Sequence, residues 1–580
     1  MEKIWKLKEL SGENGAPDNE GIDTFIEEMR ALRTNIQLPE TILRILYSRG
    51  ITNYAKTVKF FRPTKERLYD PFLLKDARKA AERLTDIIAT KEKIMVLGDY
   101  DVDGTCGVSL FYLFLKHFGV DSQIYIPDRI LEGYGISEKA INLAHEQGIK
   151  LIVAIDCGIT AYDKVEYAKT LGIDFIICDH HRPPDLIPDA FAVLDPLRKD
   201  DTYPYKYLCG TGVAFKLAQA VCKLMNEEEF AFTLLDFVAI ATASDIVPIT
   251  DENRIMLSEG LDMINENPRP SIRTILEASG LEPGTINTGK IVFTLAPRIN
   301  AVGRLGDAKR AVEMLTSLDD EVIGKLAEEL NEENLNRREI DKTITEHAIR
   351  QCEELILLDG NYTLILHNDD WHPGVIGIVA ARMVEKFHLP SIVLTTVNGV
   401  AKGSARSISG FNIYEALKKC EGELIQFGGH YHAAGLEIHI DKIDTFKSMM
   451  NKIASEELSQ DQLTPEMEID AEITFEDISS QFVKILTFFE PFGPENMTPI
   501  FMTRKVQIIG DVRYAKSHTH LFKVRDETGV YFDAVFFSSE KFHEQLQPGV
   551  YCDMCYSVDH NYWNGAYKTK LRVRDMKFVY

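Results

Sequence analysis

The run GDYDVDG at 98–104 directly follows the apolar stretch 94–97, which reads as a buried strand. Asp99, Asp101 and Asp103 stand two residues apart in it. Three carboxylates this close repel one another unless a cation lies among them, so the spacing predicts a metal site. A solvated acidic turn is the alternative, but carboxylates that end a buried strand favour a catalytic divalent metal.

The same pattern, Asp-x-Asp-x-Asp-Gly, also begins an EF-hand calcium loop. That loop needs a bidentate Glu at its twelfth position, which counted from Asp99 is Leu110. The triplet also follows a strand-like run, where an EF-hand has a helix. Both observations weigh against a calcium loop.

Strand-like apolar runs alternate with helical patterns in this part of the chain. Continuous apolar strands that alternate with helices predict a parallel sheet covered on both faces. The strand-like runs are 93–98, 123–127, 151–156 and 175–181, and the helical patterns between them include 107–119 and 137–148.

Polar side chains stand where these runs end. Asp156 ends one run, Asp179-His180-His181 end the next, and the apolar run 237–248 brings Asp245. Ligand sites in parallel sheets form at the carboxyl ends of the strands. Four separate segments therefore deliver acids or imidazoles to one rim, and this convergence predicts a functional site.

The rest of the chain predicts further domains. A charged helical stretch without Pro reads as a connector, a smaller α/β pattern follows it, and five short strands near the end suit a closed barrel of the OB type. The expected boundaries are a helical lead-in at 1–50, the parallel-sheet domain at 51–317, the connecting helix at 318–355, the second α/β domain at 356–455 and the barrel at 465–580.

The expected barrel carries basic and aromatic residues on its rim. Such a mixture fits single-stranded nucleic acid, whose bases stack and whose phosphates pair with cations, although an ordinary barrel surface is the alternative. The residues are Arg513, Tyr514, Lys516, Lys523, Arg525, Tyr562, Trp563, Lys568 and Lys570.

Composition sets limits on the class of protein. A chain of 580 residues favours several domains, and a net charge of −24 weighs against nucleic acid wrapping the whole surface. No stretch approaches the roughly 20 apolar residues of a membrane span. The start has no apolar signal-peptide core and the nine cysteines form no spaced framework, so we expect reduced thiols in a cytoplasmic protein.

Together these residues resemble the DHH phosphoesterase superfamily and, within it, the exonucleases specific for single-stranded DNA. The resemblance spans most of the chain. Beyond GDYDVDG and Asp179-His180-His181, it includes the segments 127–137, 296–308, 371–383, 403–407, 427–435 and 488–496.

The resemblance implies a DHH domain, a connecting helix, a DHHA1 domain and an OB domain. It implies Mn²⁺ or Mg²⁺, two ions in all, and degradation of single-stranded DNA from the 5′ end to mononucleotides in DNA repair and recombination. It further implies a monomer, with a single-strand binding protein and a helicase as expected partners.

Motif by motif, the resemblance also implies roles for individual residues. Metal-ligand positions fall on Asp101, Asp103, Asp156, His180 and Asp245, with Asp156 as the bridge between the ions. His181 faces the scissile phosphate, as a proton donor or a transition-state stabiliser. The positions that contact DNA or its 5′ phosphate are Arg129, Arg298, Arg304, Ser404, Arg406 and His430.

One position departs from the family pattern. Many members have a metal-binding His two residues before the first Asp, where this chain has Leu97. Either Asp99 or a water fills that place, or one metal site is weak. Two other functions stay open: a DHH phosphodiesterase for short oligonucleotides or cyclic dinucleotides, and a non-catalytic replication scaffold.

Overall fold

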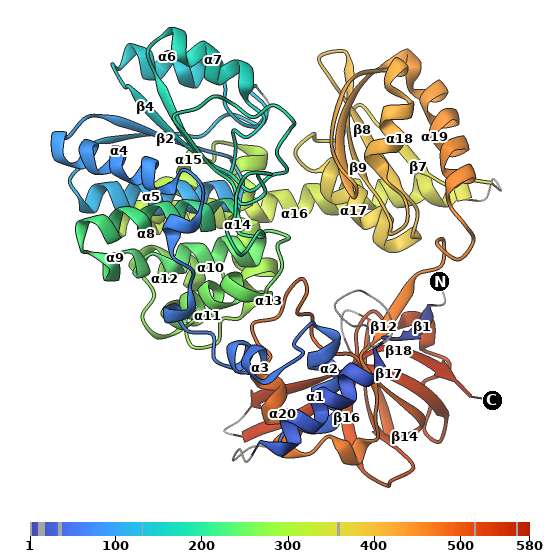
Figure 1. Cartoon of the computed structure of the whole chain (residues 1–580). Coiled ribbons are helices and arrows are strands. Elements are labelled where there is room, and N and C mark those ends of the chain that lie inside the picture. Colours follow the sequence, from blue (N-terminus) through green and yellow to red (C-terminus); the bar gives the residue numbers. More distant parts are fainter. Residues whose placement is uncertain are drawn as a thin grey trace. The chain divides into compact units, whose positions relative to one another are not determined.

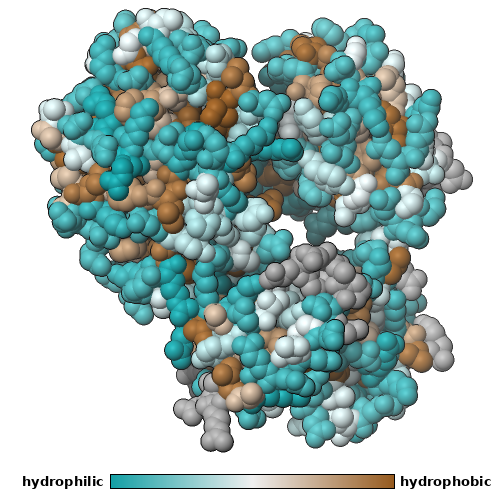
Figure 2. All heavy atoms as spheres, viewed as in Figure 1, coloured by the Kyte–Doolittle hydropathy of each residue, from teal (hydrophilic) through white to brown (hydrophobic). Residues whose placement is uncertain are grey.

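The computed structural model describes residues 3–9, 18–32, 37–129, 131–356, 360–515, 518–563 and 566–579 (Figure 1). The chain divides into two compact units. The smaller contains Met1–Ile4, Asp128–Leu131 and Pro297–Met467, and the larger contains Trp5–Pro127, Glu132–Ala296 and Glu468–Tyr580. On the face drawn in Figure 2, hydrophilic residues prevail and apolar ones are scattered between them. Among the described residues, no helix combines the length and apolar character needed to cross a membrane.

The larger unit contains the predicted parallel sheet. Its five strands lie in the order β3-β2-β4-β5-β6, and every neighbouring pair is parallel. All residues of β2 and β4 are buried, as continuous apolar runs require. The bounds are β2 (Ile94–Gly98), β3 (Ser122–Tyr125), β4 (Leu151–Ile155), β5 (Asp174–Cys178) and β6 (Ala192–Leu194). The first four confirm the predicted strands. The fifth, β6 at the sheet edge, was not predicted.

Helices cover both faces of this sheet (Figure 1). On one face, α6 (Glu138–Glu146) and α7 (Tyr162–Thr170) share an apolar core with the strands. On the other lie α4 (Ala77–Thr90), α5 (Val102–His117) and α8 (Gly210–Met225). The apolar run 237–248 begins within α10 (Leu235–Ser244), which is buried all round except at Ser244, and α11 (Asp251–Glu266) follows it.

The closed barrel predicted near the end of the chain is also present in the larger unit. Its strands lie in the order β13-β14-β15-β16-β18-β17, and β14 also pairs with β17 and closes the barrel. The short β13 (Ala471–Glu472) precedes the five predicted strands. These are β14 (Phe501–Ala515), β15 (Thr519–Arg525), β16 (Tyr531–Phe536), β17 (Tyr551–Trp563) and β18 (Ala566–Phe578).

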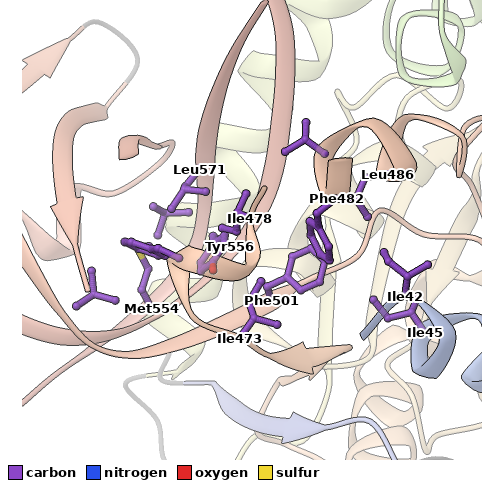
Figure 3. Close-up of a cluster of buried hydrophobic side chains, with 14 of the residues drawn as sticks. Ile42, Ile45, Ile473, Ile478, Phe482, Leu486, Phe501, Met554, Tyr556 and Leu571 are labelled. Carbon is purple, nitrogen blue, oxygen red and sulfur yellow. The ribbon is translucent and has the colours of Figure 1, made fainter. Parts of the chain in front are cut away.

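The N-terminal segment packs against this barrel. It comprises β1 (Ile4–Leu7), α1 (Asn19–Ala31) and α2 (Glu40–Ser48). Figure 3 shows Ile42 and Ile45 of α2 beside the side chains of α20 (Ser480–Thr487), with Phe501 of the barrel next to them. One apolar core therefore joins the first and last parts of the chain.

The smaller unit contains a mixed sheet in the order β10-β11-β9-β8-β7. Only β7 (Leu364–His367) and β8 (Ser391–Val397) pair in parallel; β9 (Val400–Arg406), β10 (Leu424–His430) and β11 (Ala433–His439) are antiparallel. Its α-helices are α14 (Ala296–Leu305), α15 (Lys309–Thr316), α16 (Asp320–Ile356), α17 (Ile376–Phe387), α18 (Ile413–Lys419) and α19 (Ile443–Glu457). The predicted connecting helix corresponds to α16, which has 37 residues.

Candidate metal centre and cationic pocket

The acidic triplet leads from β2 into α5. Asp101 is the N-cap of α5, and its carboxylate accepts a hydrogen bond from Gly104 N at 3.1 Å. A Cβ at position 104 would lie 2.4 Å from the carbonyl oxygen of Asp99, so only glycine permits this tight turn. The turn aims several carboxylates at one place.

Asp103 is held by the start of another helix. Its two carboxylate oxygens accept hydrogen bonds from Gly210 N (2.7 Å) and Thr211 N (2.8 Å), the first two residues of α8. These N–H groups have no partner within their own helix. A Cβ at position 210 would lie 2.5 Å from Asp156 Cβ, so this glycine lets α8 approach the centre.

Asp156 follows β4 with φ of 60°, in the left-handed region. Asp and Asn adopt this conformation more readily than most other residues. Its backbone N–H donates to Cys178 O at 2.8 Å, which ties the turn to the neighbouring strand β5. The carboxylate stands at the middle of the carboxyl edge of the sheet.

The predicted ligands converge on His180. Its Nε2 lies 3.2 Å from Asp156 Oδ1, 3.7 Å from Asp245 Oδ2 and 3.8 Å from Asp103 Oδ2. Ligand atoms within 4.8 Å of one another form three groups, each able to hold an ion. They are Asp156 with His180 and His181, Asp103 with His180 and Asp245, and Asp99 with Asp101 and Asp156. The structure thus brings together every residue predicted for the metal site.

The cluster carries more negative charge than its own residues neutralise. Burial, reinforced by Asp103 and other nearby carboxylates, raises the pKa of Asp156 well above its usual range. Burial also raises the pKa of Asp245 to about 6. Asp156 Oδ1 and Asp245 Oδ2 are buried and accept no hydrogen bond from any residue that the structure describes.

The same carboxylates shift the pKa of His180. Burial alone would lower the pKa of its imidazole, but Asp245 and Asp103 outweigh burial and raise it. A divalent cation would supply the missing positive charge and satisfy the orphaned oxygens. Carboxylate oxygens with one or two imidazoles suit Mn²⁺ or Mg²⁺, whereas thiolates would favour zinc. The residues present therefore fit the metal.

Leu97 does not take part. It lies in β2 with no exposed surface and belongs to the apolar core on the α6 side of the sheet. Asp99, two residues on, lies within the ligand group of Asp101 and Asp156. Of the alternatives for the missing histidine, the geometry favours Asp99.

Asp179 holds the backbone of both histidines and the ring of His181, a role that the sequence did not reveal. Its buried carboxylate accepts hydrogen bonds from the backbone N–H groups of Ile159 (2.9 Å), His180 (2.8 Å) and His181 (3.2 Å). His181 Nδ1 lies 2.7 Å from the same carboxylate. Burial would raise the pKa of Asp179, but the contact with His181 outweighs it and lowers the pKa to about 2. Its place directly before two histidines was the available signal.

Tyr134 is a second residue that the sequence did not single out. Its hydroxyl donates to the backbone oxygen of Asp156 at 2.8 Å and lies 3.2 Å from His181 Nδ1. The side chain of His181 is 47% exposed, so its ring can meet a substrate. Tyr134 lies in the segment 127–137, but no spacing in that segment distinguished it from its neighbours.

The smaller unit has a pocket of about 420 Å³ with cations in its lining. Arg129, Arg304, Lys402 and Arg406 line it with Ser404, and no acidic residue is among the described residues of the lining. Arg406 donates to Ser404 Oγ at 3.2 Å. Burial, with Arg129 nearby, lowers the pKa of Arg406. An anion is the ligand that such a pocket fits.

The hairpin between β10 and β11 completes one wall of this pocket. Gly429 has φ of 148°, and a Cβ there would lie 2.4 Å from Ala433 O, so glycine is required. His430 is exposed at the end of β10 and is not part of the lining. Arg298 is also elsewhere, donating to Asn331 Oδ1 at 3.0 Å. Four of the six predicted DNA contacts therefore meet in the pocket.

The structure describes most of the residues predicted for the basic rim of the barrel. Its exposed members are Arg513, Tyr514, Lys523, Arg525, Lys568 and Lys570. Lys516 and the side chains of Tyr562 and Trp563 lie outside the described residues.

Family models match three parts of the chain. They are "DHH family, N-terminal domain" at residues 93–242, "DHHA1 domain" at 360–456 and "RecJ OB domain" at 469–575. Together with the acids and histidines at the sheet edge, these matches define the class: a DHH phosphoesterase.

Curated relatives narrow the class. The chain is 35% identical to the single-stranded-DNA-specific exonuclease RecJ of Bacillus subtilis, over 95% of this chain and 69% of that one. It is 32% identical to RecJ of Escherichia coli, over 80% and 83%. The chain belongs to the RecJ family of single-stranded-DNA-specific exonucleases.

Solved structures of RecJ proteins are similar to this chain as well. RecJ of Thermus thermophilus in complex with Mn²⁺ has the same fold, with a TM-score of 0.82, 24% identity and coverage of 99% of this chain and 79% of that one. An exonuclease RecJ bound to manganese is 30% identical, with a TM-score of 0.59 over 67% of this chain and 96% of that one.

Proposed function

We propose that this protein is a metal-dependent exonuclease that degrades single-stranded DNA from its 5′ end to mononucleotides, in DNA repair and recombination. The observation that carries the proposal is the convergence of carboxylates from three segments on His180 of a fourth, with buried, orphaned oxygens among them. Membership of the RecJ family supplies the substrate class.

Asp99, Asp101, Asp103, Asp156, Asp245 and His180 would hold the metal. When bound, Mn²⁺ or Mg²⁺ neutralises charge on the phosphate and makes water a stronger nucleophile. Two ions fit the group of Asp103 with His180 and Asp245 and the group of Asp99 with Asp101 and Asp156. Asp156, which lies 3.2 Å from His180 Nε2, would be shared between them. Backbone N–H groups of α8 fix Asp103, so the ligands keep their places before substrate arrives.

His181 would donate a proton to the leaving oxygen. Burial lowers the pKa of its imidazole, but the hydrogen bond to Asp179 outweighs burial and raises it, so the ring stays protonated more readily near neutral pH. Asp179 fixes the ring orientation through Nδ1, and the partly exposed ring can reach a phosphodiester. The Tyr134 hydroxyl lies 3.2 Å from the same Nδ1 and supports the ring there.

The cationic pocket would bind the 5′ phosphate. Arg406 and Ser404 lie in contact at its wall, and the guanidinium fork matches phosphate oxygens. Arg129 and Arg304 add positive charge. The requirement for a terminal phosphate in this pocket would restrict cleavage to a free 5′ end. The protein would act as a monomer, with a single-strand binding protein and a helicase as partners.

The test uses 5′-labelled DNA as single strand and as blunt duplex, together with dinucleotides and cyclic dinucleotides, each with Mn²⁺ and with EDTA. The proposal predicts labelled mononucleotides from the single strand with Mn²⁺ alone. Preferential cleavage of the dinucleotides would favour the small-substrate phosphodiesterase. Single-strand binding without any cleavage would favour the scaffold.

A further inference from the structure

The segment FFEPFGPEN at 488–496, here called the clasp, has no part in the proposed reaction. It leads from α20 towards β14 and lies in the larger unit with the metal centre. We propose that the clasp positions Asp245 at the metal centre, with Arg254 and Gly493 as its positioning residues. This inference rests on the proposed function, because Asp245 needs positioning only if the centre holds metal.

The clasp contacts the short connection between α10 and α11, which carries Asp245. The backbone N–H of Ile249 donates to Pro494 O at 2.8 Å, and Ile249 is 1% exposed. Gly493 packs directly on that side chain: a Cβ there would lie 2.4 Å from Ile249 Cγ1. The contact leaves no room for movement of Ile249 towards the clasp.

The connection between Asp245 and Ile249 has little slack. Asp245 N donates to Ala241 O at 2.9 Å, which fixes the ligand to the end of α10. Pro248 O accepts hydrogen bonds from Tyr205 OH and from Asn253 Nδ2, each at 3.0 Å. Since only three residues separate Asp245 from Ile249, a displacement of Ile249 would also displace Asp245.

Arg254 fixes the shape of the clasp. Its side chain is 3% exposed, and it donates to backbone oxygens only. A guanidinium has five N–H groups, and here five carbonyl oxygens accept from them. They belong to Phe60 (3.0 Å), Phe488 (3.0 Å), Phe489 (2.9 Å), Glu490 (2.8 Å) and Pro491 (3.3 Å).

Asn496 closes the clasp from within. Its Nδ2 donates to Phe489 O at 2.8 Å and to Pro491 O at 2.9 Å, and its backbone pairs with that of Gly493. The clasp is therefore a rigid loop held by Arg254, on the first turn of α11 and nine residues beyond Asp245. A rigid loop that contacts Ile249 can set the position of Asp245.

The test is titration of the full chain with Mn²⁺ by calorimetry. Gly493→Ala adds one methyl against Ile249, and we expect roughly tenfold weaker Mn²⁺ binding, the lower end of the effect of outer contacts on metal affinity. Gly324→Ala is the control, since a Cβ there meets nothing within 4 Å. It should leave Mn²⁺ affinity unchanged.

Relief of the contact should restore the affinity. In Gly493→Ala combined with Ile249→Ala, the two side-chain atoms nearest the new methyl are removed, and the next is the Cβ of residue 249 at 3.5 Å, an ordinary contact. We expect Mn²⁺ affinity within about twofold of that of Ile249→Ala alone, because the two changes occupy the same space. Persistence of the full tenfold loss would overturn the clasp as the cause.

A double-mutant cycle with Asp245→Asn identifies the residue through which the clasp acts. The effect of Gly493→Ala should shrink to less than about twofold when the Asp245 carboxylate is absent. If Asp245→Asn alone leaves Mn²⁺ affinity unchanged, the ligand set of the proposed function fails. If Asp245→Asn weakens binding but Gly493→Ala does not, the positioning role fails and the metal centre stands.

Asn496→Ser keeps the test decisive if Gly493→Ala does not fold. It removes the two hydrogen bonds to Phe489 and Pro491, together with the one that Asn496 Oδ1 accepts from Arg49, without adding an atom. We expect weaker Mn²⁺ binding by this variant as well, with unchanged far-UV circular dichroism. Native Mn²⁺ affinity in the folded Asn496→Ser protein would overturn the proposal.

Discussion

The metal centre and the cationic pocket carry opposite charges, but each gathers side chains of one sign in one place. At the centre, buried carboxylates face one another with too little positive charge nearby. In the pocket, three arginines and a lysine line a cavity without any acid among its described lining residues, and of these cations Lys402 pairs with Glu437 outside the lining at 3.0 Å. In each region side chains of like charge lie close together, so a ligand of the opposite sign would stabilise it: a cation at the centre and an anion in the pocket.

The two regions differ in how rigidly they hold their groups. At the centre, short carboxylates are fixed by backbone N–H groups, as Asp103 is by the start of α8. In the pocket, long arginine side chains extend from a strand (Arg406), a helix (Arg304) and a loop (Arg129). We therefore expect substitutions at the centre to abolish hydrolysis almost completely. Substitutions in the pocket should weaken DNA binding by degrees.

The largest effect should follow Asp156→Asn. Asn tolerates the left-handed backbone of this position, so the variant removes the charge and keeps the turn. We expect hydrolysis of labelled single-stranded DNA to fall by roughly 10³-fold or more, since metal ions contribute several kcal/mol of transition-state stabilisation. DNA binding measured by fluorescence anisotropy should persist. Near-native hydrolysis would reject the ligand assignment.

A buried ion pair in the larger unit gives a stability comparison for the acidic cluster of the metal centre. Lys216 and Glu252 have no exposed side-chain surface, and Lys216 Nζ lies 2.6 Å from Glu252 Oε1. Lys216→Met would leave the carboxylate unpaired and should lower the free energy of unfolding by about 3–5 kcal/mol. Urea denaturation in EDTA measures it.

In the same EDTA assay, Asp156→Asn should not lower the free energy of unfolding, because it removes one of several carboxylates that repel one another. A loss for Asp156→Asn as large as that for Lys216→Met would show that the acidic cluster stabilises the fold without metal, contrary to our interpretation.

Arg406→Gln tests the pocket. Loss of charge-assisted hydrogen bonds of about 1.5–3 kcal/mol should weaken binding of 5′-phosphorylated single strands by roughly 10- to 100-fold. Strands with a 5′ hydroxyl should bind native and variant protein alike. Lys447→Gln, on α19 outside the pocket, is the matched charge control. Equal losses for both kinds of strand would mean that Arg406 reads something other than the terminal phosphate.

Tyr134→Phe should have the smallest effect. It removes the hydroxyl that donates to Asp156 O and lies beside His181, and a neutral hydrogen bond is worth about 0.5–1.5 kcal/mol. We expect kcat to fall about tenfold or less, with unchanged Mn²⁺ affinity by calorimetry. A loss of Mn²⁺ affinity instead would place Tyr134 in support of the metal rather than of His181.

The contrast between the regions also explains what the sequence could predict. The metal ligands follow apolar strands, and parallel strands bring their carboxyl ends to one edge, so Asp156 and His180 could be placed together from pattern alone. Asp245 follows a helix, which periodicity could not distinguish from a strand in an all-apolar run. Its place at the same edge still followed from the convergence of acids.

The pocket had no such pattern. Arg129 and Arg406 are far apart in the chain, and only the family resemblance pointed to them. Arg298 and His430 came from the same resemblance, and the structure places both outside the pocket lining. Tyr134 acts through a backbone oxygen, and Arg254 through carbonyl groups, contacts that leave no trace in residue spacing.

The central claim is that acids from three segments and His180 from a fourth bind divalent ions. Crystals grown with Mn²⁺ and measured at the manganese absorption edge test it most directly. We predict anomalous density within coordination distance of both Asp156 and His180. Ordered crystals in Mn²⁺ with no anomalous density at these side chains would contradict it.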